Sequence, residues 1–116
     1  AFTLRAVEDM AGGETFVPML PAATVGDLAV AAAGSAYPCT ITGLRPGGEK
    51  RHEALLSREE PPRTRLSGDR FTIMPSHHSW LAEWRWPDDA RSVLDAYTSD
   101  RPARMLSVPE IQGLIL

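Results

Sequence analysis

Apolar and polar residues follow two different periods along this chain, and the changes between them predict short helices and short strands. Apolar residues recur at helical spacing over residues 2–10, and the pattern ends at a glycine pair, as a short helix does. The β-rich segment 14–18 is closed by prolines, which predicts one short strand. A second helix is predicted from Thr24, where Asp27 supplies a capping partner, to Gly34.

The remaining chain carries the same mixture of periods. We predict a strand at 38–44, a short helix at 52–56, a hairpin of strands at 65–66 and 70–74, a helix at 88–97, and a last helix after the capping box at 107–110. The predicted fold class is therefore α/β (α+β), a small single domain of short helices packed on a small sheet. Its 116 residues suit one unit, with a core at 1–75 and a tryptophan-containing tail at 76–116.

Composition and charge narrow the possible partners. Hydrophobic residues make up 43% of the chain and charged residues 23%, as in an ordinary soluble domain. The net charge of −3 is evenly scattered, which argues against nucleic acid and anionic membranes as partners. Prolines and Asp27 interrupt the longest weakly polar stretch, so we expect no membrane span and a cytoplasmic location. Cys39 has no second cysteine to pair with, and we predict that it is buried in a strand.

Several short motifs occur in an order that carries a resemblance to a known family. They are Gly-Gly-Glu-Thr-Phe-Val-Pro at 12–18, Thr-Val-Gly-Asp-Leu-Ala at 24–29, Ile-Thr-Gly-Leu-Arg-Pro-Gly-Gly-Glu-Lys at 41–50, His-Glu at 52–53, Tyr-Thr-Ser-Asp at 97–100 and Leu-Ser-Val-Pro-Glu-Ile at 106–111. Together they resemble the bacterial polysaccharide-biosynthesis branch of the extended short-chain dehydrogenase/reductases, which contains the UDP-N-acetylhexosamine 4,6-dehydratases. The resemblance spans nearly the whole chain and implies the C-terminal, substrate-side region of such enzymes.

The part of that family that holds the nicotinamide cofactor has no counterpart in this sequence. No glycine-rich turn of the kind that binds a dinucleotide pyrophosphate occurs. The superfamily's reaction also needs a tyrosine followed four residues later by a lysine, but Ile41 follows Tyr37 and Arg101 follows Tyr97 at that spacing. We therefore expect no NAD(P) bound by this chain alone, and no complete dehydratase or epimerase activity.

The segment Arg45 to Lys50 is the main candidate ligand site. Gly47 and Gly48 permit a turn whose backbone N–H groups face an anion, and Arg45 can offer two donors to a phosphate. The resemblance implies that Arg45 holds the nucleotide diphosphate and that Glu49 holds the ribose hydroxyls. The family has one glycine here, so the second one displaces Glu49 and Lys50 by a residue. The alternative is a turn with no ligand.

Weaker candidates for catalysis are Glu49, His52, Glu53 and Tyr97. His52 and Glu53 are an acid/base pair by residue type, although neighbours on the predicted helix do not face each other. A metal site built from His77 and His78 with the aspartates at 88–89 is not expected, because adjacent histidines do not readily reach one ion.

The tryptophans of the tail have two interpretations. Trp80, Trp84 and Trp86 either seal the core or form an exposed anchor for a partner. We favour the first, because the resemblance implies a missing half against which this region would pack.

Three functional classes remain. The first is a nucleotide-sugar-binding module or accessory subunit, with a UDP-hexosamine as ligand and a cofactor-bearing partner. The second is a small stand-alone isomerase, cyclase or lyase, and the third is a structural or interaction protein. A homo-oligomer is expected in each case, because the face left bare by a missing half would otherwise be exposed. The sequence is equally compatible with a free-standing protein and with a fragment of a longer one.

Overall fold

The computed structural model describes residues 1–36, 38–77 and 85–115. The chain forms two compact units, each built from two separate segments: unit 1 is Ala1–Met19 with Ala54–Tyr97, and unit 2 is Leu20–Glu53 with Thr98–Leu116. Short helices and small antiparallel sheets confirm the predicted mixed α/β class. The division into a core at 1–75 and a tail at 76–116 stays a prediction.

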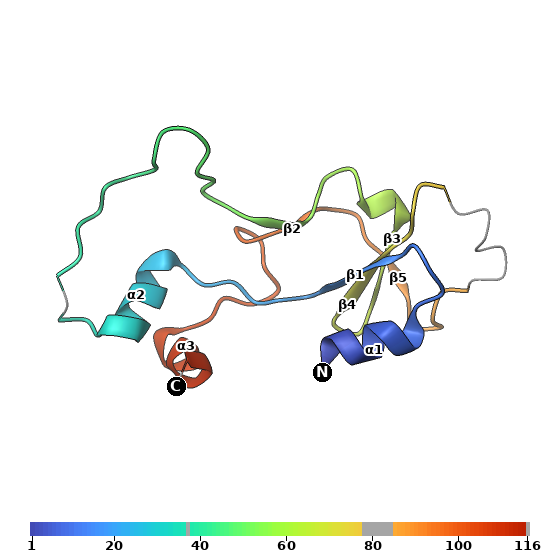
Figure 1. The fold of residues 1–116 in the computed structure, drawn as a ribbon, viewed down its shortest axis with the longest axis horizontal. Coiled ribbons are helices and arrows are strands. Elements are labelled where there is room, and N and C mark those ends of the chain that lie inside the picture. The colour runs from blue at the N-terminus through green and yellow to red at the C-terminus, as the bar shows by residue number, and fades with distance from the viewer. Residues whose placement is uncertain (37, 78–84, 116) are drawn as a thin grey trace. The chain divides into compact units, whose positions relative to one another are not determined.

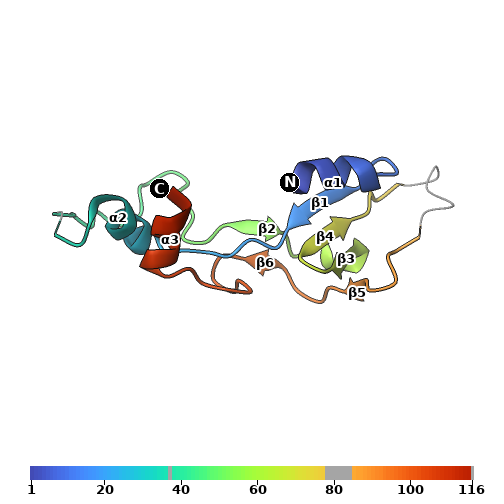
Figure 2. The same ribbon diagram turned by 90° about the horizontal axis from the view of Figure 1, so that it is seen from below.

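Unit 1 is built around a four-stranded antiparallel sheet with the strand order β1-β4-β3-β5. Its strands are β1 (Thr15–Pro18), β3 (Thr64–Ser67), β4 (Arg70–Ile73) and β5 (Arg91–Ser92). The predicted hairpin is confirmed, because β3 and β4 pair from Thr64 opposite Ile73 to Ser67 opposite Arg70. Helix α1 (Phe2–Asp9) lies beside β1 and β4 in both views (Figures 1 and 2).

The hydrophobic core of unit 1 gathers on this sheet. Val17, Leu56, Phe71 and Ile73 are buried, and partly buried apolar side chains, among them Tyr97, pack against them. Leu56 comes from the short strand β2 (Ala54–Leu56), which pairs with β6 (Tyr97–Thr98) in a two-stranded sheet. Burial of such side chains stabilises a fold by about 1.5–3 kcal/mol each.

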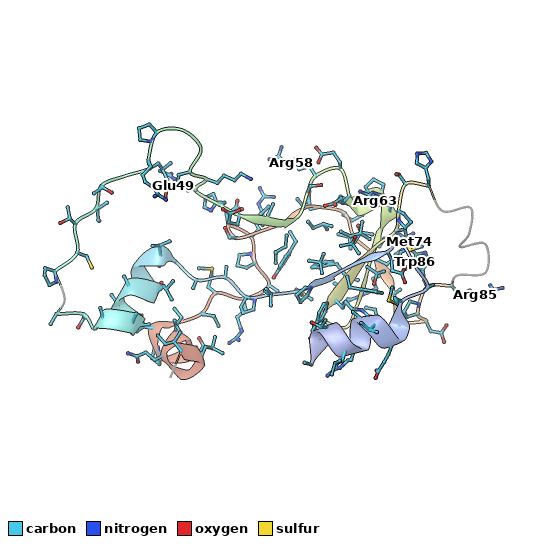
Figure 3. The ribbon with its side chains drawn as sticks, in the orientation of Figure 1. Glu49, Arg58, Arg63, Met74, Arg85 and Trp86 are labelled. Carbon is cyan, nitrogen blue, oxygen red and sulfur yellow. The ribbon has the colours of Figure 1, made fainter. Side chains whose placement is uncertain are left out.

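A single helical turn, η1 (Pro61–Arg63), leads into β3. The hydroxyl of the buried Thr64 donates to the backbone oxygen of Glu60 at 2.7 Å. The Arg63 guanidinium donates to the backbone oxygen of Met74, also at 2.7 Å, and the two residues are labelled in Figure 3. These bonds satisfy polar groups at the point where the chain enters the sheet.

Unit 2 contains two helices that pack side by side, α2 (Val25–Ala33) and α3 (Val108–Ile115) (Figures 1 and 2). Their buried residues are Ala31 and Ile111. The predicted cap of α2 is confirmed, because the Thr24 hydroxyl oxygen accepts from the Asp27 backbone N–H at 2.9 Å. The helix ends at Gly34, whose φ of 85° favours glycine.

The start of α3 is also capped as predicted. The Glu110 carboxylate accepts from the backbone N–H of Ser107 at 2.8 Å and from its hydroxyl at 2.6 Å. It also pairs with Arg104. The segment before α3 pairs with Ala22, whose N–H donates to the Arg104 oxygen at 3.0 Å and whose oxygen accepts from Leu106 at 2.8 Å.

Three predicted elements are wrong. No strand forms at 38–44, where the described residues are exposed and make no ladder, and Ile41 is 96% exposed. In place of a helix at 52–56 the chain forms β2, with Leu55 exposed and Leu56 buried as the period of a strand requires. In place of a helix at 88–97 it forms β5 and begins β6. At 52–56 and 88–97, pairing with strands distant in sequence overrides the local preference for a helix. At 38–44, no strand among the described residues pairs with the segment.

The prediction that Cys39 is buried is wrong as well, since its thiol lies in the exposed segment. Tyr37, His78, Trp80 and Trp84 fall outside the described residues. Trp86 is half-buried, and the Arg65 guanidinium lies 5.3 Å from its ring centroid.

None of the helices in the described ranges has the length and apolar character needed to cross a membrane.

Candidate functional site

The candidate ligand site at 45–50 is an exposed turn of unit 2. Pro46, Gly47 and Gly48 form the turn, and every residue from Arg45 to Lys50 is exposed. Gly47 and Gly48 have φ angles of 100° and 133°, which side-chain-bearing residues rarely adopt. The glycine pair is therefore required by the backbone path of this turn.

Arg45 and Glu49 meet across the turn. One oxygen of the Glu49 carboxylate accepts from the Arg45 backbone N–H at 2.7 Å, and the other accepts from the Arg45 guanidinium at 3.3 Å. The Arg45 side chain is 82% exposed and that of Glu49 is 35% exposed. An exposed pair of this kind contributes about 0–1 kcal/mol to stability, so the guanidinium is readily available to a ligand.

Positive charge is concentrated around this turn. Residues 45–51 include the cations Arg45, Lys50 and Arg51 and the single anion Glu49, whereas the whole chain has a net charge of −3. His52 follows directly and is exposed. A local excess of cations in a chain that is otherwise acidic attracts anions, and the effect weakens as salt increases.

A second polar segment lies next to His52 and Glu53. The Glu53 backbone N–H donates to the Ser99 hydroxyl oxygen at 2.9 Å, and the Ser99 N–H donates to the Glu53 backbone oxygen at 2.8 Å. These two bonds hold Glu53 beside Ser99, which directly follows strand β6.

The electrostatics of this neighbourhood favour an ionised Asp100. The pKa of Asp100 is lowered mainly by a hydrogen bond from the Thr98 side chain and next by its own backbone N–H. The positive charges of His52 and Arg101 lower it further. The charge of the Asp100 carboxylate is thus influenced by His52, although the hydrogen bonds have the larger effect on its pKa.

Sequence reasoning missed Ser99 and Asp100 as site residues. They lie about 46 positions from Glu53 and His52, and no local periodicity connects segments so far apart. The available signal is the polar run Thr98-Ser99-Asp100, which belongs to one of the motifs that carry the family resemblance.

Tyr97 has a different environment from the other candidate catalytic residues. It belongs to unit 1, where its half-buried ring lies 5.1 Å from the ring of Phe71, centroid to centroid.

The described ranges contain no group of three metal-ligating side chains. Of the aspartates considered for a metal site, Asp89 accepts a hydrogen bond from the Ser67 hydroxyl at 2.7 Å.

Unit 1 also has a cavity of about 210 Å³ between α1 and the β3–β4 turn. It is lined by Phe2, Arg5, Asp9, Ser67, Asp69 and Arg70. The Arg70 guanidinium is already engaged, because it bonds to Asp9 at 2.5 Å and lies 4.7 Å from the Phe16 ring centroid. The Arg70 side chain is only 18% exposed, whereas that of Arg45 is 82% exposed, so the turn at 45–50 is the stronger candidate for an anionic ligand.

Comparison with known proteins identifies the family. The family model for polysaccharide biosynthesis proteins matches residues 1–75 of this chain. The chain belongs to this family. The resemblance seen in the sequence is confirmed for this part of the chain, because the motifs at 12–18, 24–29 and 41–50 all lie within the matched residues.

Two relatives show how much of the family's length this chain represents. The inverting UDP-N-acetylglucosamine 4,6-dehydratase of Campylobacter jejuni is 37% identical over 75 residues, which are 65% of this chain and 22% of that protein. The X-ray structure of Pen from Bacillus thuringiensis has a TM-score of 0.71 and 25% identity, and the match covers 97% of this chain and 34% of that chain. The match with this member of the polysaccharide-biosynthesis family thus covers about a fifth of the length of the first relative and about a third of the length of the second.

Proposed function

We propose that this chain binds the diphosphate of a nucleotide sugar, such as a UDP-hexosamine, at the turn formed by residues 45–50. The observation that carries the proposal is the highly exposed Arg45 guanidinium, held by a weak pair with Glu49 among further cationic side chains. The family match and a relative named for UDP-N-acetylglucosamine support the choice of ligand.

The chemistry of the turn suits a diphosphate. A guanidinium donates two parallel hydrogen bonds to phosphate oxygens, and Lys50 and Arg51 add positive charge within six residues of Arg45. Hydrogen bonds to charged groups contribute roughly 1.5–3 kcal/mol each. A few such bonds are enough for binding in the micromolar to millimolar range, where a free energy of about 4–8 kcal/mol applies.

In this proposal the chain is the C-terminal, substrate-side part, or an accessory subunit, of a nucleotide-sugar dehydratase or epimerase. The nicotinamide cofactor is held outside this chain, either by a partner or by another part of a longer protein. The absence of a glycine-rich dinucleotide turn from the sequence supports that division. Exposed apolar side chains on α1, such as Leu4 and Val7, support a further proposal that the chain associates with a second copy or with such a partner.

Calorimetric titration of the 116-residue chain with UDP and with UDP-N-acetylglucosamine tests the proposal. We expect Arg45→Ala to weaken binding of both ligands about tenfold, because one charge-assisted contact of about 1.4 kcal/mol is lost. The matched control is Arg58→Ala, an exposed arginine of unit 1 that is labelled in Figure 3.

The control variant should bind as the unchanged chain does. Equal loss in the two variants would mean that general positive charge, rather than Arg45, attracts the nucleotide. No measurable binding by the folded, unchanged chain would refute the proposal.

A further inference from the structure

Glu49 uses both of its carboxylate oxygens on a single residue. One oxygen takes the backbone N–H of Arg45 and the other takes its guanidinium, at 2.7 and 3.3 Å. These are two of the donors that an incoming phosphate would use, since a phosphate also presents two oxygens to a fork of N–H groups. The carboxylate therefore stands in the position of an anionic ligand.

We propose that Glu49 is an internal competitor for the anion-binding donors of Arg45 and that it determines which ligands the turn accepts. The proposal rests on the function proposed above. It assigns Glu49 a role opposite to the ribose contact that the family resemblance implies, because removal of its charge would strengthen binding of a diphosphate instead of weakening it.

The competition has a chemical consequence for ligand choice. A ligand carboxylate would replace one carboxylate by another and would gain little from the exchange. A diphosphate carries more negative charge and more acceptor oxygens, so it can contact Arg45 while it also attracts Lys50 and Arg51. The turn should therefore select nucleoside diphosphates over carboxylates and other weak anions.

An anionic ligand can displace Glu49 from Arg45 because both side chains are accessible to solvent. The Arg45 side chain is 82% exposed and the Glu49 side chain is 35% exposed, and the two residues are only four positions apart on an exposed turn. Breaking such a pair has a small cost, so Glu49 can swing away without disturbing Ala31 and Ile111, which are the buried residues among those described in unit 2.

The test is to titrate the unchanged chain and Glu49→Gln with inorganic pyrophosphate and with UDP. We expect the variant to bind both ligands up to about fivefold more tightly, by a similar factor for each, because the competing charge is gone while the side chain keeps its size. Glu59→Gln is the control for overall charge, since Glu59 is an exposed glutamate of unit 1 outside the candidate site. Its gain should stay below twofold.

Three results would overturn the proposal. If Glu49→Gln weakens UDP binding and leaves pyrophosphate unchanged, Glu49 contacts the ribose. If Glu49→Gln and Glu59→Gln strengthen binding equally, the effect is one of overall charge. If the unchanged chain binds UDP, loses it with Arg45→Ala, and Glu49→Gln has no effect, the proposed function stands and the competitor role fails.

A fourth result concerns both proposals. If neither the unchanged chain nor Glu49→Gln binds either anion, the proposed function fails and the competitor role fails with it.

Discussion

Unit 1 buries Val17, Phe71 and Ile73 on a four-stranded sheet, whereas the described residues of segment 38–53 in unit 2 are exposed without exception. The first arrangement is held by apolar burial, and the second is held by polar contacts such as those of Arg45 with Glu49 and of Glu53 with Ser99. On the proposed function, the difference means that stability and ligand binding can be changed separately in this chain.

The magnitudes support this separation. A fully buried apolar side chain stabilises a fold by about 1.5–3 kcal/mol, while an exposed ion pair contributes about 0–1 kcal/mol. Substitutions in the sheet of unit 1 should therefore lower the free energy of unfolding, and substitutions in the turn at 45–50 should change affinity with little effect on folding.

The largest effect on stability is expected for Leu56→Ala. Leu56 is 0% exposed, so its truncation should leave a cavity and lower the free energy of unfolding by about 2–5 kcal/mol. Urea unfolding followed by circular dichroism measures the change. The neighbouring Leu55→Ala is the matched control, because Leu55 is 43% exposed and should cost less than about 1 kcal/mol. Equal losses at the two positions would contradict the described core.

A smaller effect is expected at the cap of α3 in unit 2, where the contacts are polar. The pKa of Glu110 is lowered mainly by the hydrogen bond from the Ser107 hydroxyl and next by the one from the Ser107 backbone N–H. The positive charge of Arg104 lowers it further. A carboxyl with a depressed folded pKa contributes its stability above its unfolded value of about 4.3 and loses it as pH falls through the folded pKa.

Glu110→Gln should therefore make the urea midpoint less sensitive to acidification below about pH 4.3 than it is in the unchanged chain. The measurement is the midpoint at a series of pH values between about 5.5 and 3. Glu59→Gln, at an exposed position of unit 1, is the control and should leave the pH dependence as it was. An identical pH dependence in the unchanged chain and in Glu110→Gln would contradict the role of this cap.

Much of the fold follows from local signals in the sequence. The caps at Thr24 and Ser107 were predictable because each places a hydroxyl residue and a carboxylate residue three positions apart. The β3–β4 hairpin was predictable because Gly68 marks the turn between two β-rich runs, and its φ is 58°.

The remaining elements depend on contacts that local sequence does not encode. Segment 38–44 has strand-like composition but no ladder partner among the described residues, so it stays exposed. The segment at 52–56 looks helical, yet pairing with β6 converts it into β2. At the candidate site, the position of Arg45 and the glycine pair was predictable from the motif, whereas the bonds between Glu53 and Ser99 join positions 46 residues apart.

The most direct test of the central claim is to follow the backbone amide signals of the ¹⁵N-labelled chain by NMR during titration with UDP. If the turn of unit 2 is the ligand site, signals of residues 45–53 should shift most, while those of the unit 1 strands β3 and β4 should stay unchanged. Shifts centred on residues that line the cavity of unit 1, such as Arg5 and Arg70, or no shifts at all, would contradict the claim.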